Sequence, residues 1–209
     1  IAMAAVAIIC AAVGFSDTDK AQKPTEPPTI PVIATQAPTT APVDNTLTLS
    51  FIGDCILGSE STSNREGNFT WYSENYPLNY FFEKVYSVLS EDDFTLSNME
   101  CVLSDNPDLE KTFKDYDPAF WFKAKAENAK ILTEGSVEVA GVVNNHTYDY
   151  GDEGYSDTIA SLKAANLMVG EDCEPVYFEK NNMKIGVVYC NLWGYWQVDY
   201  VIDALNQMQ

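Results

Sequence analysis

Hydrophobic residues recur with two different periods along the chain after its first 44 residues. Residues 46–52 (TLTLSFI) alternate between apolar and polar positions and are rich in β-branched side chains, which predicts a strand. Residues 137–143 (VEVAGVV) form an almost continuous apolar run, which is typical of a strand buried on both faces. Residues 78–89 and 152–165 instead place large apolar side chains every three or four positions, which predicts two amphipathic helices.

Shorter segments extend this pattern. Residues 124–134 have a high helix propensity and are followed by Gly135, a residue that commonly ends helices. Val201, Leu205 and Met208 predict a further amphipathic helix near the end of the sequence. Additional strands are predicted at residues 93–97, 167–169, 176–179 and 184–189. The last two flank Asn181-Asn182, a pair that tolerates positive φ, so we expect them to form a β-hairpin.

The alternation of strands and helices predicts an α/β fold, with a largely parallel sheet covered by helices. In such sheets, ligands bind just outside the carboxyl ends of the strands. We therefore expect functional side chains in the turns that follow the predicted strands.

The first 44 residues have a different composition. Residues 1–15 (IAMAAVAIICAAVGF) carry no charge, which predicts a transmembrane anchor or a signal segment. Residues 16–44 contain six of the ten prolines among Thr, Ala and Gln, which is the composition of an extended Pro/Thr-rich linker. Residues 45–209 form the predicted folded domain. This order predicts a single-pass protein of the cell membrane with an extracytoplasmic domain, and a secreted protein is the alternative.

The charge of the chain excludes one class of function. There are 12 Lys and Arg residues against 31 Asp and Glu residues, a net charge of −19. Binding to nucleic acid needs clustered basic side chains against the phosphates, so we expect no nucleic-acid partner. The five cysteines have no CxxC spacing and the chain has a single histidine, so a zinc finger or ribbon is also excluded.

Polar side chains follow three of the predicted strands. Asp54 follows the first strand, Asn98 and Glu100 follow the second, and Asn145 and His146 follow the third. Each residue alone is compatible with an ordinary turn, but the ends of neighbouring parallel strands lie at one edge of a sheet. Carboxylate, amide and imidazole groups are ligands for Mn²⁺, Mg²⁺, Zn²⁺ or iron. The pattern predicts a divalent metal site with ligands Asp54, Asn98, Glu100 and Asn145, and His146 as a general acid.

Three motifs with this spacing resemble those of the CapA family of capsule and poly-γ-glutamate synthesis proteins. They are LTLSFIGDCILG, DDFTLSNMECVLSD and VVNNHTYDYGDEGYSDTIASLKAANLMVGED. The third motif is the most specific, because Asn-Asn-His is followed by Asp-x-Gly and a Thr-containing helix. The resemblance implies a metallophosphoesterase-like (calcineurin-like) fold, with a layered sheet and flanking helices.

The resemblance also implies roles for individual residues. Asp54 and Glu100 would be metal-binding carboxylates, and Asn145 would be the amide ligand of the metal. His146 would be the acid, and Asp149 would orient it through a hydrogen bond as part of the catalytic group. Two departures stand out. The first motif has Asp54-Cys55-Ile56 where metallophosphoesterases usually have Asp-x-His. Metallophosphoesterases also have further histidines beyond the third motif, whereas no histidine follows His146 in this sequence. We therefore expect a domain that is truncated at its C-terminus.

The resemblance implies a role in the synthesis, export or attachment of an anionic surface polymer. The expected partners are this polymer or its precursors, membrane-bound polymer synthase subunits, and the membrane through the N-terminal segment. The reaction would be metal-dependent hydrolysis or transfer at a phosphoester or acyl bond. The alternatives are a non-catalytic scaffold of a synthase complex and a phosphoesterase of unrelated physiology.

Overall fold

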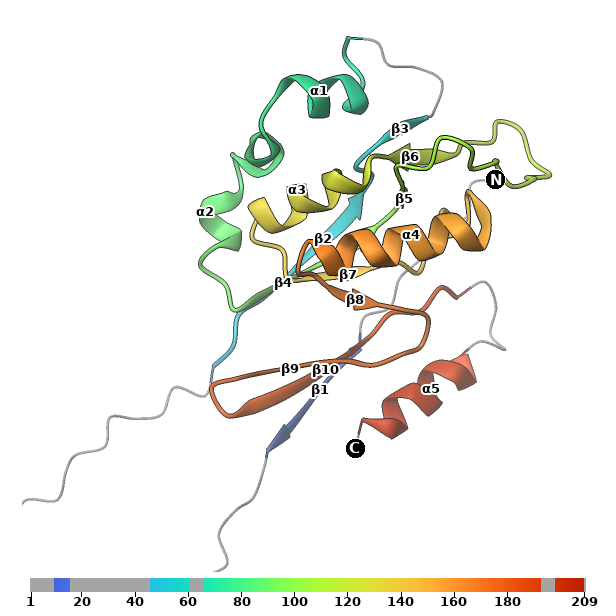
Figure 1. Cartoon of the computed structure of the whole chain (residues 1–209). Coiled ribbons are helices and arrows are strands. Elements are labelled where there is room, and N and C mark those ends of the chain that lie inside the picture. The colour runs from blue at the N-terminus through green and yellow to red at the C-terminus, as the bar shows by residue number, and fades with distance from the viewer. Residues whose placement is uncertain (1–9, 16–45, 61–65, 193–197, 209) are drawn as a thin grey trace, which may run out of the picture.

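A computed structural model describes residues 10–15, 46–60, 66–192 and 198–208 of the chain (Figure 1). The predicted linker at 16–44 lies outside the described residues, as does most of the predicted anchor. Residues Cys10–Phe15 form strand β1 in the structure. Among the described residues, none of the helices is both long and apolar enough to cross a membrane.

The centre of the fold is a four-stranded parallel sheet with the order β2-β4-β7-β8. Its strands are β2 (Leu49–Cys55), β4 (Phe94–Met99), β7 (Val139–Gly141) and β8 (Met168–Gly170). These strands correspond to the first four strands predicted from the hydrophobic pattern. The expected α/β class with a largely parallel sheet is therefore confirmed.

Helices cover one face of this sheet. The longest helix, α4 (Gly151–Ala164), and the short α3 (Ala129–Glu134) pack on it through buried apolar side chains such as Leu162, Ile131 and Leu132. The single helix predicted at 78–89 is instead a 3₁₀ turn, η1 (Leu78–Phe82), followed by one turn of α-helix, α2 (Tyr86–Leu89). This segment is rich in aromatic and β-branched residues, which have low helix propensity.

The opposite face of the central sheet packs on an antiparallel sheet with the order β1-β10-β9. Strands β9 (Val176–Lys180) and β10 (Met183–Val188) form the predicted hairpin. Its turn residues, Asn181 and Asn182, have φ values of 54° and 62°, as expected for a two-residue hairpin turn. Helix α5 (Val198–Gln207) packs on this layer through Val201 and Ala204. Figure 1 shows the resulting stack of helices, parallel sheet, antiparallel sheet and α5.

Smaller elements extend the side of the molecule that carries the first helix. Strands β3 (Ser59–Glu60), β6 (Phe122–Ala124) and β5 (Val102–Leu103) form a small sheet in that order. Helix α1 (Phe69–Asn75) is capped by the Asn68 side chain, which accepts a hydrogen bond from the Trp71 backbone N–H. A 3₁₀ turn, η2 (Ala126–Asn128), leads into α3.

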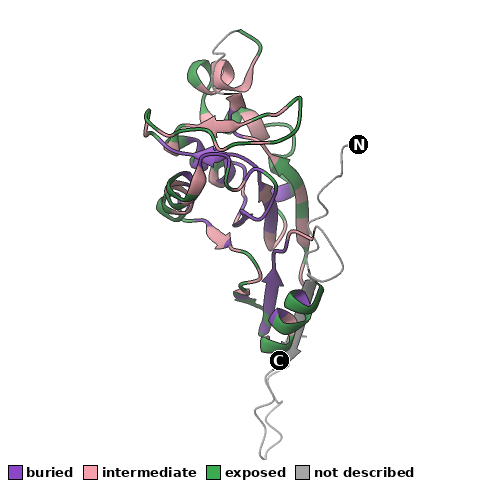
Figure 2. Ribbon diagram, turned by 90° about the vertical axis from the view of Figure 1, so that its right-hand side faces the viewer, coloured by how far each residue is buried: buried purple, intermediate pink, exposed green. Residues whose placement is uncertain are grey.

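Tyr189 joins the two main sheets. Its side chain is 1% exposed and lies in the apolar cluster between the sheets, with Leu96 and Val139. Figure 2 shows that buried positions, in purple, gather in the strands at the centre of the molecule. The ring covers Gly141 at the end of β7 and Gly170 at the end of β8, and a Cβ added at either glycine would overlap it. Glycine at both positions is therefore required for the close packing of the two sheets.

We expect Gly141→Ala and Gly170→Ala each to destabilise the protein by about 1–3 kcal/mol, because a methyl group would displace a buried ring from a well-packed core. The free energy of unfolding, measured by urea denaturation, checks this. Gly53→Ala is the matched control, since a Cβ there meets nothing within 4 Å. Equal stability of the Gly53 and Gly141 variants would contradict the proposed packing constraint.

Candidate functional site

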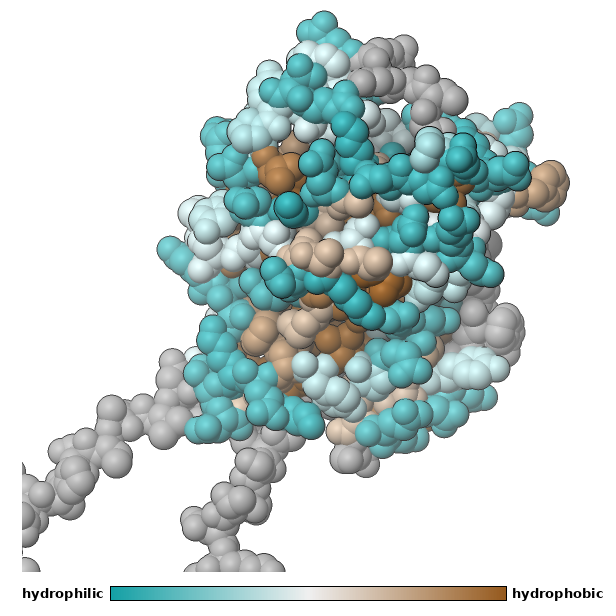
Figure 3. Space-filling model, viewed as in Figure 1, coloured by the Kyte–Doolittle hydropathy of each residue, from teal (hydrophilic) through white to brown (hydrophobic). Residues whose placement is uncertain are grey.

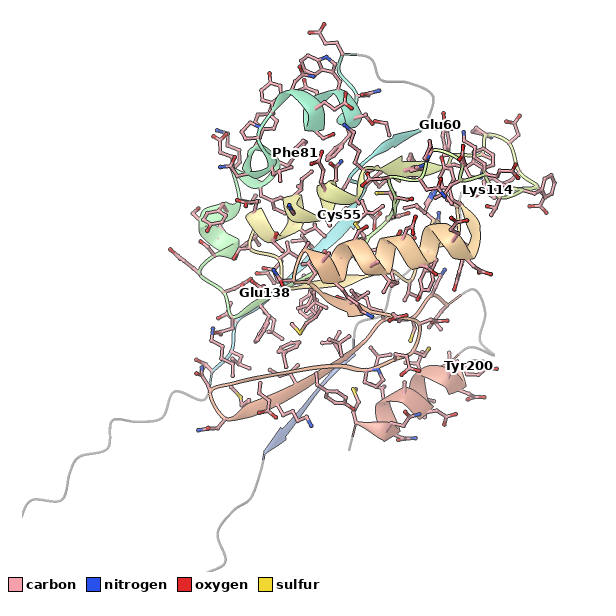
Figure 4. All side chains as sticks on the ribbon, viewed as in Figure 1. Cys55, Glu60, Phe81, Lys114, Glu138 and Tyr200 are labelled. Atoms are coloured by element: carbon pink, nitrogen blue, oxygen red, sulfur yellow. The ribbon has the colours of Figure 1, made fainter. Side chains whose placement is uncertain are left out.

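Two parallel strands end together and place three polar side chains at one edge of the central sheet. Asp54 of β2 is the register partner of Asn98 of β4. The backbone N–H of Glu100 donates to the Cys55 carbonyl oxygen over 3.1 Å, so the pairing continues just beyond β4. Figure 4 shows Cys55 on β2 near this edge, and Glu138 near the opposite end of the sheet.

The Asn98 side chain links the groups at this edge. Its Nδ2 donates to Asp54 Oδ1 over 2.8 Å and to Glu100 Oε2 over 3.2 Å. Its Oδ1 accepts a hydrogen bond from Asn144 Nδ2 over 3.1 Å. One amide therefore holds the two carboxylates together and connects them to the turn that follows β7.

That turn brings Asn144 into the network, where the sequence pointed to Asn145. The Asn144 Nδ2 group also donates to the Met99 carbonyl oxygen over 2.8 Å, and Asn144 Oδ1 accepts the His146 backbone N–H over 2.9 Å. Asn144 is buried, whereas Asn145 is exposed at the tip of the turn. Among the described residues, no hydrogen bond joins Asn145 to Asp54, Asn98 or Glu100, so its expected role as a metal ligand stays a prediction.

His146 is buried and held by Asp149. Its Nδ1 lies 2.8 Å from Asp149 Oδ2, and a carboxylate can only accept, so the Nδ1 atom carries the hydrogen. Asp149 Oδ2 also accepts the Phe122 backbone N–H over 2.8 Å, and Asp149 Oδ1 lies 2.5 Å from Lys114 Nζ. The hydrogen bond expected between Asp149 and His146 is present in the structure.

Lys114 also belongs to this site, and no sequence motif predicted it. Its side chain is 9% exposed, and its ammonium group donates to the Phe120 carbonyl oxygen over 2.6 Å and lies 5.3 Å from the Trp121 ring centroid. The labelled Lys114 lies at the same end of the molecule as Glu60 (Figure 4). This cation is the ion-pair partner of the fully buried Asp149 carboxylate, which a buried carboxylate requires.

Among the described residues, no Lys or Arg side chain forms an ion pair with Asp54 or Glu100. Burial, followed by the neighbouring carboxylate of Asp54, raises the pKa of Glu100 from 4.5 to about 7. The His146 Nε2 atom, on the ring side away from Asp149, lies 3.9 Å from Glu100 Oε1. Two carboxylates therefore share one edge with a single imidazole.

This donor set fits a divalent metal ion. Asp54 and Glu100 supply oxygen atoms, and the Nε2 atom of His146 lies beside them on a ring that Asp149 orients. The raised pKa of Glu100 reflects its burial and the second carboxylate that this site brings beside it. Within the described part of the chain, the group of His, Cys, Asp or Glu ligand atoms that lie within 4.8 Å of one another is a different one, formed by Asp172, Cys173 and Cys190.

A cavity of about 510 Å³ borders the His146 turn. The cavity is lined by residues from the His146 turn and its surroundings, and by residues near the end of β10: Lys114, Asn145, Tyr148, Asp149, Asp172 and Asn191. Asn145 thus faces a space large enough for a small substrate, although it stands apart from the carboxylates.

Sequence reasoning missed Asn144, Lys114 and Phe122. Asn144 is the first residue of the Asn-Asn-His motif, but the motif alone does not indicate which of the two asparagines points inward. Lys114 and Phe122 reach Asp149 through tertiary contacts alone. No spacing along the chain marks them.

The fold and the site together define a metallophosphoesterase-like α/β domain, with acidic, amide and imidazole side chains at the carboxyl edge of a parallel sheet. The chain belongs to the family described as bacterial capsule synthesis protein PGA_cap, whose model matches residues 48–201. It is 27% identical over 127 residues to the protein named PGA biosynthesis protein CapA of Bacillus subtilis (strain 168). That alignment covers 59% of this chain and 30% of the relative. The resemblance to the CapA family, and the fold it implied, are confirmed.

We expect Glu100→Gln to raise the melting temperature of the metal-free protein above pH 7. In the folded protein the pKa of Glu100 is about 7, whereas the ordinary pKa of a Glu side chain is 4.5. The folded state thus binds more protons between these values, so its stability falls as the pH rises through that window. An increase of about 2–4 °C is expected at about pH 8, with none at about pH 4.

Thermal unfolding in the presence of a chelator measures this difference. The exposed Glu91→Gln variant is the control and should melt with the parent at both pH values. A Glu100→Gln variant that melts below the parent at about pH 8 would contradict the unfavourable charge at Glu100.

His146 is the sole histidine of the chain, so its ring gives one set of ¹⁵N signals. We expect the neutral ring to carry its proton on Nδ1, because Asp149 accepts a hydrogen bond there. The double variant Asp149→Ala/Lys114→Met, which leaves no buried charge unpaired, should lose this preference. An Nε2-protonated ring in the parent would contradict the assigned contact.

Proposed function

We propose that this protein is an extracytoplasmic component of capsule or poly-γ-glutamate production that acts on its polymer, or on a precursor, by metal-dependent hydrolysis or transfer. The observation that carries this proposal is the pairing of Asp54 and Glu100 through Asn98, beside a histidine held by Asp149. Membership of the capsule synthesis family supports the physiological role.

Asp54 and Glu100 are the residues that would hold the metal ion, with His146 next to them. When bound, a divalent ion at this edge supplies a Lewis acid for a phosphoryl or acyl oxygen. The candidate ions are Mn²⁺, Mg²⁺, Zn²⁺ and iron, and the metal-content measurement described below distinguishes them.

The protein groups have separate tasks in this reaction. The Asp149 carboxylate fixes the His146 ring, so the Nε2 atom faces the sheet edge and is the position from which a proton reaches a leaving group. Asn98 and Asn144 hold the carboxylates and the turn in register. Lys114 forms an ion pair with Asp149.

The charge of the chain bears on its substrate. A chain of net charge −19 repels a polyanion such as poly-γ-glutamate, and the face seen in Figure 3 is largely hydrophilic. A cation held by Asp54 and Glu100 would offset this repulsion where the polymer meets the protein. The same ion would then serve for both binding and chemistry.

The proposed location follows from the N-terminal segment. The Pro/Thr-rich stretch at 16–44 is typical of a tether that holds a domain away from a membrane. The uncharged stretch at 1–15 is typical of a signal or anchor segment, of which Cys10–Phe15 pair with β10 in this structure. The expected partners there are membrane-bound polymer synthase subunits. A cleaved signal would give a secreted protein instead.

Metal content of the complete protein tests the proposal. We expect a stoichiometric divalent metal, measured by plasma mass spectrometry after incubation with Mn²⁺, Zn²⁺ or Mg²⁺, and a loss of at least tenfold in affinity in Glu100→Gln and His146→Ala. Glu138→Gln is the matched control. Burial also raises the pKa of this carboxyl, but it lies at the amino end of β7, where it accepts the Thr95 backbone N–H.

The outcomes separate the candidate functions. Metal in the parent and in Glu138→Gln, but not in folded Glu100→Gln, supports a metal site at the sheet edge and directs the search to phosphoester and acyl substrates. A well-folded parent that binds none of these ions would overturn the metalloenzyme proposal. The non-catalytic scaffold would then be tested by capture of synthase subunits.

A further inference from the structure

Two cysteines far apart in the sequence lie in contact on the side of the molecule where β10 ends. The Sγ atoms of Cys173 and Cys190 are 3.0 Å apart, although 17 positions separate the residues along the chain. Cys173 follows β8 in the connection to β9, and Cys190 lies just after β10 (Figure 1). Cys173 is half-buried, whereas Cys190 is 1% exposed.

Backbone contacts hold the two segments together. The Cys173 N–H donates to the Tyr189 carbonyl oxygen over 2.9 Å, and Asp172 forms a parallel bridge with Tyr189. Cys173 has a φ of 56°, a left-handed conformation that is uncommon for a residue other than glycine. The backbone thus turns at Cys173 in a way that directs its side chain toward Cys190.

The geometry favours a covalent bond between the two sulfur atoms over a shared metal ion. Asp172 offers a third ligand atom within 4.8 Å, so a metal ion is the alternative. Two thiolates on one tetrahedral zinc ion, each about 2.3 Å from the metal, are separated by roughly 3.7 Å. The observed 3.0 Å is shorter than this, and the Asp172 carboxylate is on an exposed residue.

We propose that Cys173 and Cys190 form a disulfide bond in the mature protein. The oxidant is a second disulfide, such as oxidised glutathione or an oxidised dithiol protein. The accessible Cys173 thiolate attacks it and releases one thiol, and the Cys190 thiolate then attacks the Cys173 sulfur of the mixed disulfide and releases the second thiol. Both cysteine protons are lost, and the oxidant receives the two electrons as two thiols.

This bond would fasten one wall of the cavity beside His146. Asp172 and Asn191, which directly adjoin the two cysteines in the sequence, both line that cavity. The bond also joins the end of β10 to the segment after β8, next to Tyr189 and the glycines that it covers. The inference rests on these contacts and is independent of the proposed function.

Peptide mapping of the complete protein tests the pair directly. The folded protein is treated with oxidised glutathione, its remaining thiols are alkylated in denaturant, and it is digested with trypsin. Cleavage after Lys163, Lys180 and Lys184 separates the two cysteines, so the bond appears as a linked pair of peptides, one covering 164–180 and one beginning at 185. Cys55→Ser is the matched control and should keep this linked pair.

Thermal stability gives a second measurement. The oxidised parent should melt about 5–10 °C above the reduced parent, because the cross-link closes a loop of moderate length. Cys173→Ser should melt at one temperature with and without reductant, and Cys55→Ser should respond as the parent does.

Three results would overturn the proposal. The first is full alkylation of Cys173 and Cys190 after oxidation of the folded parent. The second is a lasting glutathione adduct on Cys173, or a bond from either residue to another cysteine. The third is stoichiometric zinc that protects both thiols from oxidised glutathione and is lost in Cys173→Ser.

Discussion

The arrangement of the candidate site depends on the parallel register of β2, β4 and β7. Asp54 pairs with Asn98, and Asn98 in turn pairs with Gly141 at the end of β7. Three strands therefore end at nearly the same level. The side chains that follow the strands are neighbours because of this register alone. A shift of one residue in any of these strands would turn its side chains to the other face of the sheet. Tyr189 opposes such a shift, because its ring fits only where Gly141 and Gly170 lie together.

The sequence predicted the parts of this arrangement that follow from local pattern. Strand ends identified Asp54, Asn98, Glu100 and His146, because a short apolar run followed by polar residues marks where a buried strand stops. The hairpin turn was predictable for a similar reason, since two adjacent asparagines tolerate positive φ. These features depend on a few consecutive residues each.

Features set by tertiary contacts were not predictable in this way. The turn after β7 folds back on itself: the Asn144 backbone N–H donates to Thr147 Oγ1, and Asn144 Oδ1 accepts the His146 N–H. Asn144 therefore points inward and Asn145 outward, which the strand period of two cannot specify. Lys114 reaches Asp149 from a segment without regular structure, and the helix predicted at 78–89 divides into two short turns.

The distribution of charge around His146 gives the strongest physical argument for a cation at the sheet edge. Asp149 is fully buried, and Lys114 and the Phe122 N–H compensate it there. Asp54 and Glu100 share the Asn98 amide, and the nearest basic group described beside them is the His146 ring, whose Nε2 atom lies 3.9 Å from Glu100 Oε1. Burial and the Asp54 carboxylate raise the pKa of Glu100 to about 7. A buried carboxylate without a positive partner is unfavourable, so the edge is stabilised either by a proton on Glu100 or by a metal ion. Binding of a metal ion there would require Glu100 to lose that proton, because a carboxylate binds a divalent ion in its deprotonated form.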